Sequence, residues 1–300
     1  MSAPLVSVVT IFRDEERFLE EAVASVLAQT YRRWELVLVD DGSTDRSTDL
    51  AVAFAERHPG RVRYVDHPGH ANLGMSASRN RGIAESGGDL LAFLDADDVY
   101  LPRKLEAQVA ALDAHPSAAM AYGPTVHWYS WTGRPEDDRD VPRRLGVPPD
   151  TLVAPPALVP LFLRLEAQTP GTCGLLVRRE ACDRAGGFED RFRGMFEDQV
   201  FVCKVCLAEP VFVMGDGFDR YRQHPRSHSR MARSGPWAFD RPNPSTAAFL
   251  DWLAGHVAAT GVDDPEVLAA LDEVRWPHRH PVRAAGRDVV RRAMALARRP

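Results

Sequence analysis

The feature that most constrains the fold is a regular alternation of short apolar runs with segments of helical periodicity over the first 115 residues. The apolar runs are rich in Val, Ile and Leu, which predicts buried strands, and the segments between them repeat apolar residues at helical spacing. The expected strands cover residues 5–12, 34–39, 62–65 and 90–94, and the expected helices cover 14–28, 45–57, 76–86 and 102–115. Short connections between alternating strands and helices predict a parallel sheet with helices on both faces.

Polar clusters directly follow three of these expected strands. Residues 13–15 follow the first strand, 40–45 follow the second, and 95–98 follow the fourth. Ligands of open α/β sheets bind at the carboxyl ends of the strands. We therefore expect the functional site at this edge of the sheet, with helix 45–57 capped by Ser43 or Thr44.

The alternation weakens after residue 116, and the rest of the chain is more irregular. Further strands are expected at 118–122, 127–131, 172–177 and 211–214, and further helices at 179–185 and 197–207. Residues 133–150 are rich in Pro, Arg and Asp, which is typical of an exposed loop. We divide the chain into residues 1–115 and 116–232, as two halves of one domain, and residues 233–300, as a Pro-rich linker with a helical extension.

Composition narrows the class of protein. The chain is 45% hydrophobic with a net charge of −5, which is typical of a globular protein and gives no indication of nucleic acid as a partner. The N-terminus lacks the basic and apolar regions of a signal peptide, and no apolar run is long enough to span a membrane, so we expect a cytoplasmic protein. Cys203 and Cys206 have the spacing of half a zinc site, but no second close pair accompanies them, and we interpret them as buried thiols.

The sequence Asp95-Ala96-Asp97 concentrates negative charge at a strand end. Neighbouring carboxylates repel one another unless a cation or solvent screens them. In extended backbone alternate side chains point the same way, so Asp95 and Asp97 can face one ligand. Oxygen ligands suit Mg²⁺ or Mn²⁺, which would bridge to a diphosphate. The alternative is a solvated acidic turn.

Three other clusters in the first half allow both a functional and a structural interpretation. Asp40 and Asp41 can accept hydrogen bonds from a base or a ribose, or can belong to a helix cap. Phe12 can stack on a base, or can belong to the core. Arg79 and Arg81 lie early in a helix, where the dipole disfavours cations, so a phosphate partner and a solvated face are both compatible.

The second half adds three clusters. Glu197 and Asp198 open a helix, either as dipole partners or with one of them as a general base. Residues 220–230 carry four arginines and two histidines, which fits a surface patch or a phosphate clamp that includes His224. The aromatic residues of segment 127–131 could stack on a sugar ring, although buried packing is the alternative.

Taken together, three segments resemble the inverting family 2 glycosyltransferases of GT-A fold. They are VSVVTIFRDEERFLEEAVASVLAQTYRRWELVLVDDGSTDRS, ASRNRGIAESGGDLLAFLDADD and GGFEDRFRGMFEDQVF, within a likeness that spans roughly residues 4–230. The resemblance implies a Rossmann-like α/β fold with a mixed, mostly parallel sheet flanked by helices. It also implies that residues 1–115 bind a nucleotide sugar and that 116–232 bind the acceptor and carry the catalytic base.

The resemblance also implies roles for individual residues. Asp198 would be the catalytic base with Glu197 in support, and Asp97 with His224 would hold Mn²⁺ or Mg²⁺. The nucleotide sugar would contact Thr10, Phe12, Glu15, Asp40, Asp41, Arg79, Asp95 and Ala96. Family members commonly have Tyr where Phe12 stands, so stacking on the base is retained and a hydroxyl contact is not.

The implied reaction is transfer of one sugar from a nucleotide-diphosphate donor, UDP by default, to a hydroxyl of a glycan, a lipid-linked or a small-molecule acceptor. The Gln-x-x-Arg-Trp motif of the processive synthases is absent from the sequence. A sugar nucleotidyltransferase and an inactive donor-binding module are the alternatives. Residues 282–299 carry six arginines among apolar residues, which fits either a helix lying on anionic lipid or a solvated terminal helix. The sequence does not determine the oligomeric state.

Overall fold

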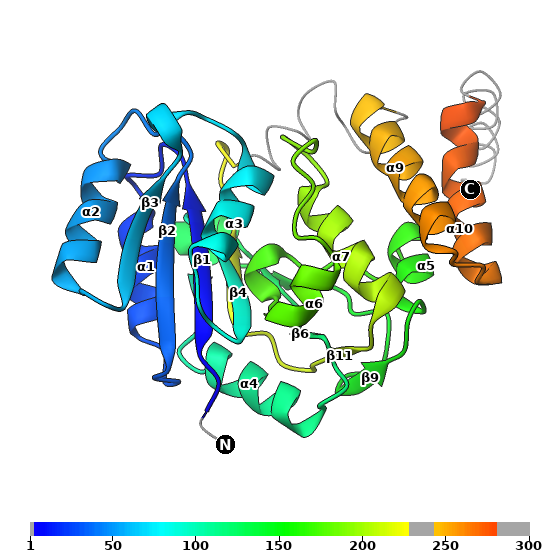
Figure 1. Ribbon diagram of the computed structural model, residues 1–300, viewed down its shortest axis with the longest axis horizontal. Coiled ribbons are helices and arrows are strands. Elements are labelled where there is room, and N and C mark those ends of the chain that lie inside the picture. Colours follow the sequence, from blue (N-terminus) through cyan, green and yellow to red (C-terminus); the bar gives the residue numbers. More distant parts are fainter. Residues whose placement is uncertain (1–2, 228–242, 281–300) are drawn as a thin grey trace.

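The computed structural model describes residues 3–227 and 243–280. Its first half follows the expected alternation of strands and helices (Figure 1). The elements are β1 (Val6–Phe12), α1 (Leu19–Leu27), β2 (Trp34–Asp40), α2 (Ser47–Arg57), β3 (Val62–Asp66), α3 (Met75–Ala84), β4 (Leu90–Asp95) and α4 (Lys104–Ala114). The predicted strands and helices of this half are therefore confirmed, with changes at their ends.

The largest change is at the start of α1, which was expected at residue 14. Asp14 has a positive φ of 55°, and its carboxylate accepts a hydrogen bond from the backbone N–H of Thr44. The Glu15 N–H donates to the hydroxyl of Ser47 at 2.8 Å. These bonds to the segment after β2 stabilise a loop where a helix was expected. The residue preceding α2 is Arg46, so the predicted cap by Ser43 or Thr44 was wrong.

In the part of the chain that the structure describes, the main sheet has eight strands in the order β3-β2-β1-β4-β10-β6-β11-β9. The strands outside the first half are β6 (Met120–Tyr122), β9 (Thr151–Val153), β10 (Leu176–Arg178) and β11 (Val211–Val213). Strands β3, β2, β1 and β4 are parallel, while β10 runs antiparallel to both β4 and β6. Strand β11 is parallel to β6, and β9 is antiparallel to β11. This mixed, mostly parallel sheet confirms the expected α/β architecture.

A second sheet of four short strands was not predicted. Its order is β5 (Val99–Tyr100), β12 (Asp219–Arg222), β7 (Val126–Trp128) and β8 (Val141–Pro142). Strand β8 lies in the segment expected to be a loop, and β7 ends at Trp128 because a short 3-10 helix follows. Because β12 pairs with β5, the residues after β12 lie beside the loop that follows β4.

Helices cover both faces of the main sheet, and two hydrophobic clusters fill the spaces between helices and sheet. The remaining helices among the described residues are α5 (Leu158–Leu163), α6 (Arg179–Arg184), α7 (Glu197–Ala208), α9 (Pro244–Thr260) and α10 (Pro265–Arg279). Short 3-10 helices occupy Pro68–His70, Ser130–Thr132, Pro135–Asp137 and Thr172–Gly174, the last where a strand was expected to begin. All four cysteines are buried and unpaired, which confirms the interpretation of Cys203 and Cys206 as buried thiols.

Helices α9 and α10 form the described part of the expected C-terminal extension, and they lie beside α5 and α7 (Figure 1). Asn243 and Asp264 cap their N-termini through side-chain oxygens. Most of the expected linker and the basic segment 282–299 lie outside the described residues. Within the described residues, no helix combines the length and the apolar character needed to cross a membrane. The division of the chain at residues 115 and 232 stays a prediction.

Candidate active site

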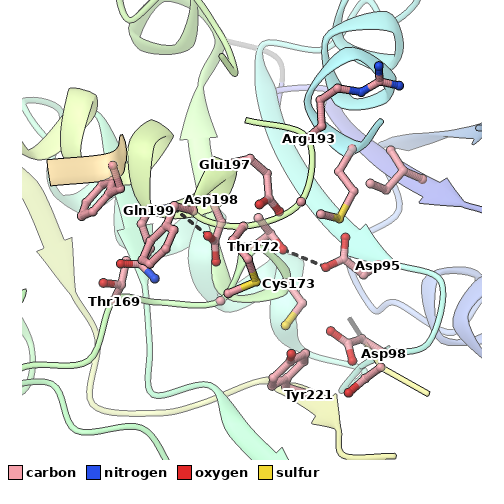
Figure 2. Close-up of a pocket in the computed structure, with 18 of the residues that line it drawn as sticks. Asp95, Asp98, Thr169, Thr172, Cys173, Arg193, Glu197, Asp198, Gln199 and Tyr221 are labelled. Carbon is pink, nitrogen blue, oxygen red and sulfur yellow. Dashed lines mark hydrogen bonds between the residues drawn. The ribbon is translucent and has the colours of Figure 1, made fainter. Parts of the chain in front are cut away.

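A pocket of about 970 Å³ opens where β1 and β4 end and α7 begins. Figure 2 shows carboxylates from the end of β4 and from the start of α7 on its wall. Eight of the residues expected at the site line this pocket. They are Phe12, Glu15, Asp41, Asp95, Ala96, Asp97, Glu197 and Asp198. Residues separated by as much as 186 positions in the sequence therefore share one cavity, which supports the expected location of the site at the carboxyl edge of the sheet.

The loop after β4 places its two carboxylates, Asp97 and Asp98, in different surroundings. The Asp97 side chain lines the pocket, and its Oδ2 is 2.9 Å from Nε2 of His224. Asp98 is buried and accepts a hydrogen bond from the backbone N–H of Arg222 at 2.8 Å. Burial and the charges of Asp97 and Asp95 raise the pKa of Asp98 well above its usual range. Asp97, with His224 beside it, is therefore the carboxylate of this loop best placed to bind a cation.

Arg79 joins the two acidic parts of the site. Its guanidinium donates to Asp95 Oδ1 at 2.7 Å and to Glu197 Oε1 at 3.1 Å, and only 1% of the residue is exposed. Asp95 also accepts from the hydroxyl of Thr172 at 3.0 Å. We expected Arg79 to approach the base or the diphosphate. Instead its guanidinium lies beneath the pocket wall, where it fixes Asp95 and Glu197 relative to each other.

Glu197 and Asp198 form the first turn of α7, where the helix dipole favours negative charge. Phe196, directly before them, has a left-handed φ of 70° and stacks on Phe249 of α9 at a ring distance of 4.9 Å. Burial, followed by the charge of Asp198, raises the pKa of Glu197 to about 7. Burial also raises the pKa of Asp198, while the charge of Arg143 opposes that shift. Both carboxyls are thus poised to exchange protons at higher pH than ordinary acids.

The expected nucleotide side of the pocket divides into lining and supporting residues. Phe12 lines it, and Asp41 accepts from the N–H groups of Leu73 and Gly74 at 2.8 and 3.0 Å, which holds the segment before α3 at the pocket. Burial, and then the charge of Asp97, raises the pKa of Glu15 to about 8. A cation near Asp97 would therefore favour ionised Glu15.

Two further residues expected at the nucleotide lie beneath the wall. Asp40 is completely buried and accepts from the Ser43 N–H and the Thr48 hydroxyl, at 2.8 and 2.6 Å. Thr10 is 1% exposed within β1. The structure therefore assigns Asp40 to the loop that follows β2, and Thr10 to the sheet under the pocket.

Several lining residues were not identified from the sequence. Arg13 and Arg193 come from loops beside Asn72. Arg143 donates to Nε2 of His127 at 3.0 Å and to the Thr169 carbonyl at 2.5 Å. Helices α9 and α10 and the adjoining α5 contribute an apolar wall, formed by Phe162, Leu163, Phe249, Leu250 and Val274. No local signal in the sequence marks these residues. Arg226 also lines the pocket, and it belongs to the basic run around His224.

A metal ion could be held by Asp97 and His224. In the described part of the chain no three His, Cys, Asp or Glu side chains are grouped as a metal site. Mg²⁺ is commonly bound by only one or two protein ligands, and substrate phosphates and water fill its remaining positions. The Asp97–His224 pair fits that kind of site and does not fit a closed structural site.

The mixed α/β sheet, with its pocket at the strand ends, is a GT-A fold. The structure of residues 1–349 of TarS from S. aureus in complex with UDP-GlcNAc superposes with a TM-score of 0.66 and 19% identity, over 90% of this chain and 70% of that one. A longer TarS structure gives a TM-score of 0.63 and 18% identity, over 91% of this chain and 42% of that one.

Residues 7–183 match the description "Glycosyl transferase family 2", and the chain belongs to this family. It is 39% identical over 114 residues to the "Putative glycosyltransferase EpsE" of Bacillus subtilis, covering 38% of this chain and 40% of that protein. It is 37% identical over 106 residues to the "Putative teichuronic acid biosynthesis glycosyltransferase TuaG" of the same organism, covering 35% and 41%. The matched region thus spans less than half of each relative.

Proposed function

We propose that the protein is an inverting, metal-dependent glycosyltransferase that moves one sugar from a UDP-sugar to an acceptor hydroxyl. The observation that carries the proposal is the meeting in one pocket of Asp97, which contacts His224, with Asp198 at the start of α7. Family membership and the GT-A fold supply the reaction class. The UDP-GlcNAc in the complex of TarS supports UDP as the first nucleotide to test.

Asp97 and His224 are the residues proposed to hold Mn²⁺ or Mg²⁺. Since they contact each other at 2.9 Å, a cation bound by both would take the place of their direct hydrogen bond. A bound divalent ion neutralises the charge that develops on a leaving diphosphate. Arg13 and Arg226, which also line the pocket, add positive charge for the same diphosphate.

The uridine is proposed to bind on the side of the pocket formed by Phe12 and Asp41. Phe12 offers an aromatic face to the base. Asp41 already uses its oxygens on the N–H groups of Leu73 and Gly74, so a base N–H would share an oxygen that is held rigidly by the backbone. The sugar is accordingly proposed to lie between the nucleotide and the carboxylates of Asp95 and Asp198.

Asp198 is proposed to remove the proton from the acceptor hydroxyl. A carboxylate whose pKa is raised by burial is a stronger base near neutral pH than an exposed one. Attack on the anomeric carbon from the face opposite the diphosphate forms the new C–O bond as the old one breaks, so the configuration inverts. Glu197, held by Arg79, supports the position of Asp198 on α7.

The donor is tested by thermal denaturation with a panel of nucleotide sugars in the presence of Mn²⁺. The preferred donor stabilises the folded protein most, because the stabilisation grows with ligand concentration relative to Kd. A panel in which no uridine nucleotide shifts the midpoint, while another nucleotide does, would overturn the UDP assignment.

The base is tested with Asp198→Asn, measured by donor hydrolysis with Mn²⁺, in which water replaces the acceptor. Turnover should fall by at least ~100-fold, the usual contribution of a positioned base, with UDP affinity unchanged. Asp183→Asn, an exposed acid on α6, is the matched control. Wild-type turnover in Asp198→Asn would refute the base assignment. A wild-type protein that binds UDP and never releases sugar would instead favour the donor-binding module.

A further inference from the structure

A buried arginine at the end of β12 contacts the acidic loop from behind. Arg222 is 3% exposed and does not line the pocket. Three aromatic rings surround its guanidinium, with ring centres at 4.7 Å for Phe18, 4.4 Å for Trp128 and 5.0 Å for Trp131. Aromatic faces attract cations, most strongly where water is excluded. The aromatic segment 127–131 therefore holds an arginine, and this use was not predicted from the sequence.

The polar groups of Arg222 bind the backbone and side chains of the acidic loop. Its Nε donates to the carbonyl oxygen of Asp97 at 2.7 Å, and its backbone N–H donates to Asp98 Oδ1 at 2.8 Å. Its Nη2 donates to Glu21 Oε2 at 2.5 Å, which balances its charge. Arg222 thus fixes the peptide group of Asp97 and the side chain of Asp98.

The same segment also reaches the carboxylate of Asp97. His224 follows Arg222 by two residues, and its Nε2 lies 2.9 Å from Asp97 Oδ2. His224 itself packs against Phe18 at a ring distance of 5.0 Å, so the aromatic cage supports both residues. Asp97 is therefore held at its carbonyl by Arg222 and at its carboxylate by His224.

The contacts of residue 222 require the guanidinium group of an arginine. A guanidinium is planar, so its faces can pack on aromatic rings while its edges donate in fixed directions. An ammonium group is a compact charge and cannot keep the ring contacts and both directed hydrogen bonds together. Metal and diphosphate geometry depends on groups behind the direct ligands, which hold those ligands in orientation.

We propose that Arg222 is a positioning residue that orients Asp97 for the metal–diphosphate complex, with Phe18, Trp128 and Trp131 as its support. The inference rests on the proposed function, because it assumes that Asp97 binds a metal ion with the diphosphate. Because Arg222 ends β12, the inference also means that the four-stranded sheet, which was not predicted, determines the geometry of this metal site.

The test compares UDP affinity in EDTA and in Mn²⁺ by calorimetry. The Kd in EDTA divided by the Kd in Mn²⁺ gives a ratio that measures the contribution of the metal. Arg222→Met should reduce that ratio at least tenfold while leaving the Kd in EDTA unchanged, and Arg222→Lys should recover only part of it. Glu21→Gln replaces the ion-pair partner of Arg222 at a half-exposed side chain, so the core stays intact. It should reduce the same ratio two- to threefold, and it replaces Arg222→Met in the test if that variant does not fold.

Arg178→Met is the matched control, because Arg178 also donates to backbone carbonyls, those of Ala118 and Leu112 at 2.8 Å, far from the pocket. It should lower thermal stability without changing the ratio. A wild-type ratio in Arg222→Met, or in Glu21→Gln where the first variant is unfolded, overturns the positioning role alone. A wild-type protein with equal Kd values in EDTA and Mn²⁺ overturns the metal site of the proposed function, and the positioning role with it.

Discussion

Replacing Arg79 with methionine tests whether the two acidic parts of the site depend on one buried cation. Methionine keeps much of the length and the apolar stem, and it removes the hydrogen bonds to Asp95 and Glu197. Both carboxylates then lose a partner in a site where water cannot fully replace it. We expect the folded protein to be destabilised and the loss to depend on pH.

The size of the loss follows from burial. Removing one partner of a buried ion pair costs about 3–5 kcal/mol. The Glu197 side chain is only 9% exposed, whereas that of Asp95 is 27% exposed and keeps part of its hydration. The lower end of the range is therefore appropriate, and we expect a decrease of ~3 kcal/mol in the free energy of unfolding at pH 8.

The pH dependence has a definite sign. The pKa of Glu197 rises from its ordinary 4.5 to about 7 on folding, so the folded state holds more protons between these values. Stability linked to this group is therefore greatest below pH 4.5 and decreases as the pH rises towards 7. Because Arg79 lowers the pKa of Glu197, its removal raises that pKa further. At about pH 5.5 Glu197 is largely neutral with or without Arg79, so the variant should lose clearly less stability there than at pH 8.

Urea denaturation of the wild-type protein, Arg79→Met and the double variant Arg79→Met/Glu197→Gln at both pH values measures these differences. The double variant should be more stable than the single variant at pH 8, since it no longer buries an unpaired carboxylate. An equal loss at both pH values, or no recovery in the double variant, would refute the reasoning.

Three further outcomes are expected. Donor turnover should fall as the pH is lowered, because a buried Asp198 with a raised pKa becomes protonated and cannot accept a proton; a flat pH–rate profile would contradict this. His224→Asn should weaken Mn²⁺-dependent UDP binding and leave metal-free binding unchanged, as measured by calorimetry. Gly74→Ala should destabilise the fold by ~1–3 kcal/mol and weaken UDP binding, because Gly74 has a φ of +93° and its N–H donates to Asp41. Denaturation and UDP titration measure the two effects, and wild-type values in both would contradict the prediction.

The first half of the fold could be predicted from the sequence because its signals are local. Each strand there is an uninterrupted apolar run, and each helix repeats its apolar positions within a few turns. The strands run parallel and follow one another with short connections, so their polar ends fall on one edge without further information. This is why Asp41, Asp95 and Asp97 could be assigned to one site before the structure was known.

The second half could not be predicted in the same way because its strands are short and their partners are distant. Strand β5 has two residues and pairs with β12 about 120 positions later, so neither carries a pattern that periodicity can detect. The left-handed Phe196 also has no sequence signal, since its conformation is stabilised by packing on Phe249 from the C-terminal extension.

The sequence by itself indicated most of the acids that line the pocket and the edge of the sheet at which they lie, although Asp40 is buried beneath the pocket wall. Only the tertiary structure decided their partners and their state of ionisation. Arg79 reaches Glu197 across 118 positions, and His224 reaches Asp97 across 127, through contacts made only when both halves pack together. The raised pKa values of Glu15, Glu197 and Asp198 arise first from burial, which depends on the whole fold and on no single segment.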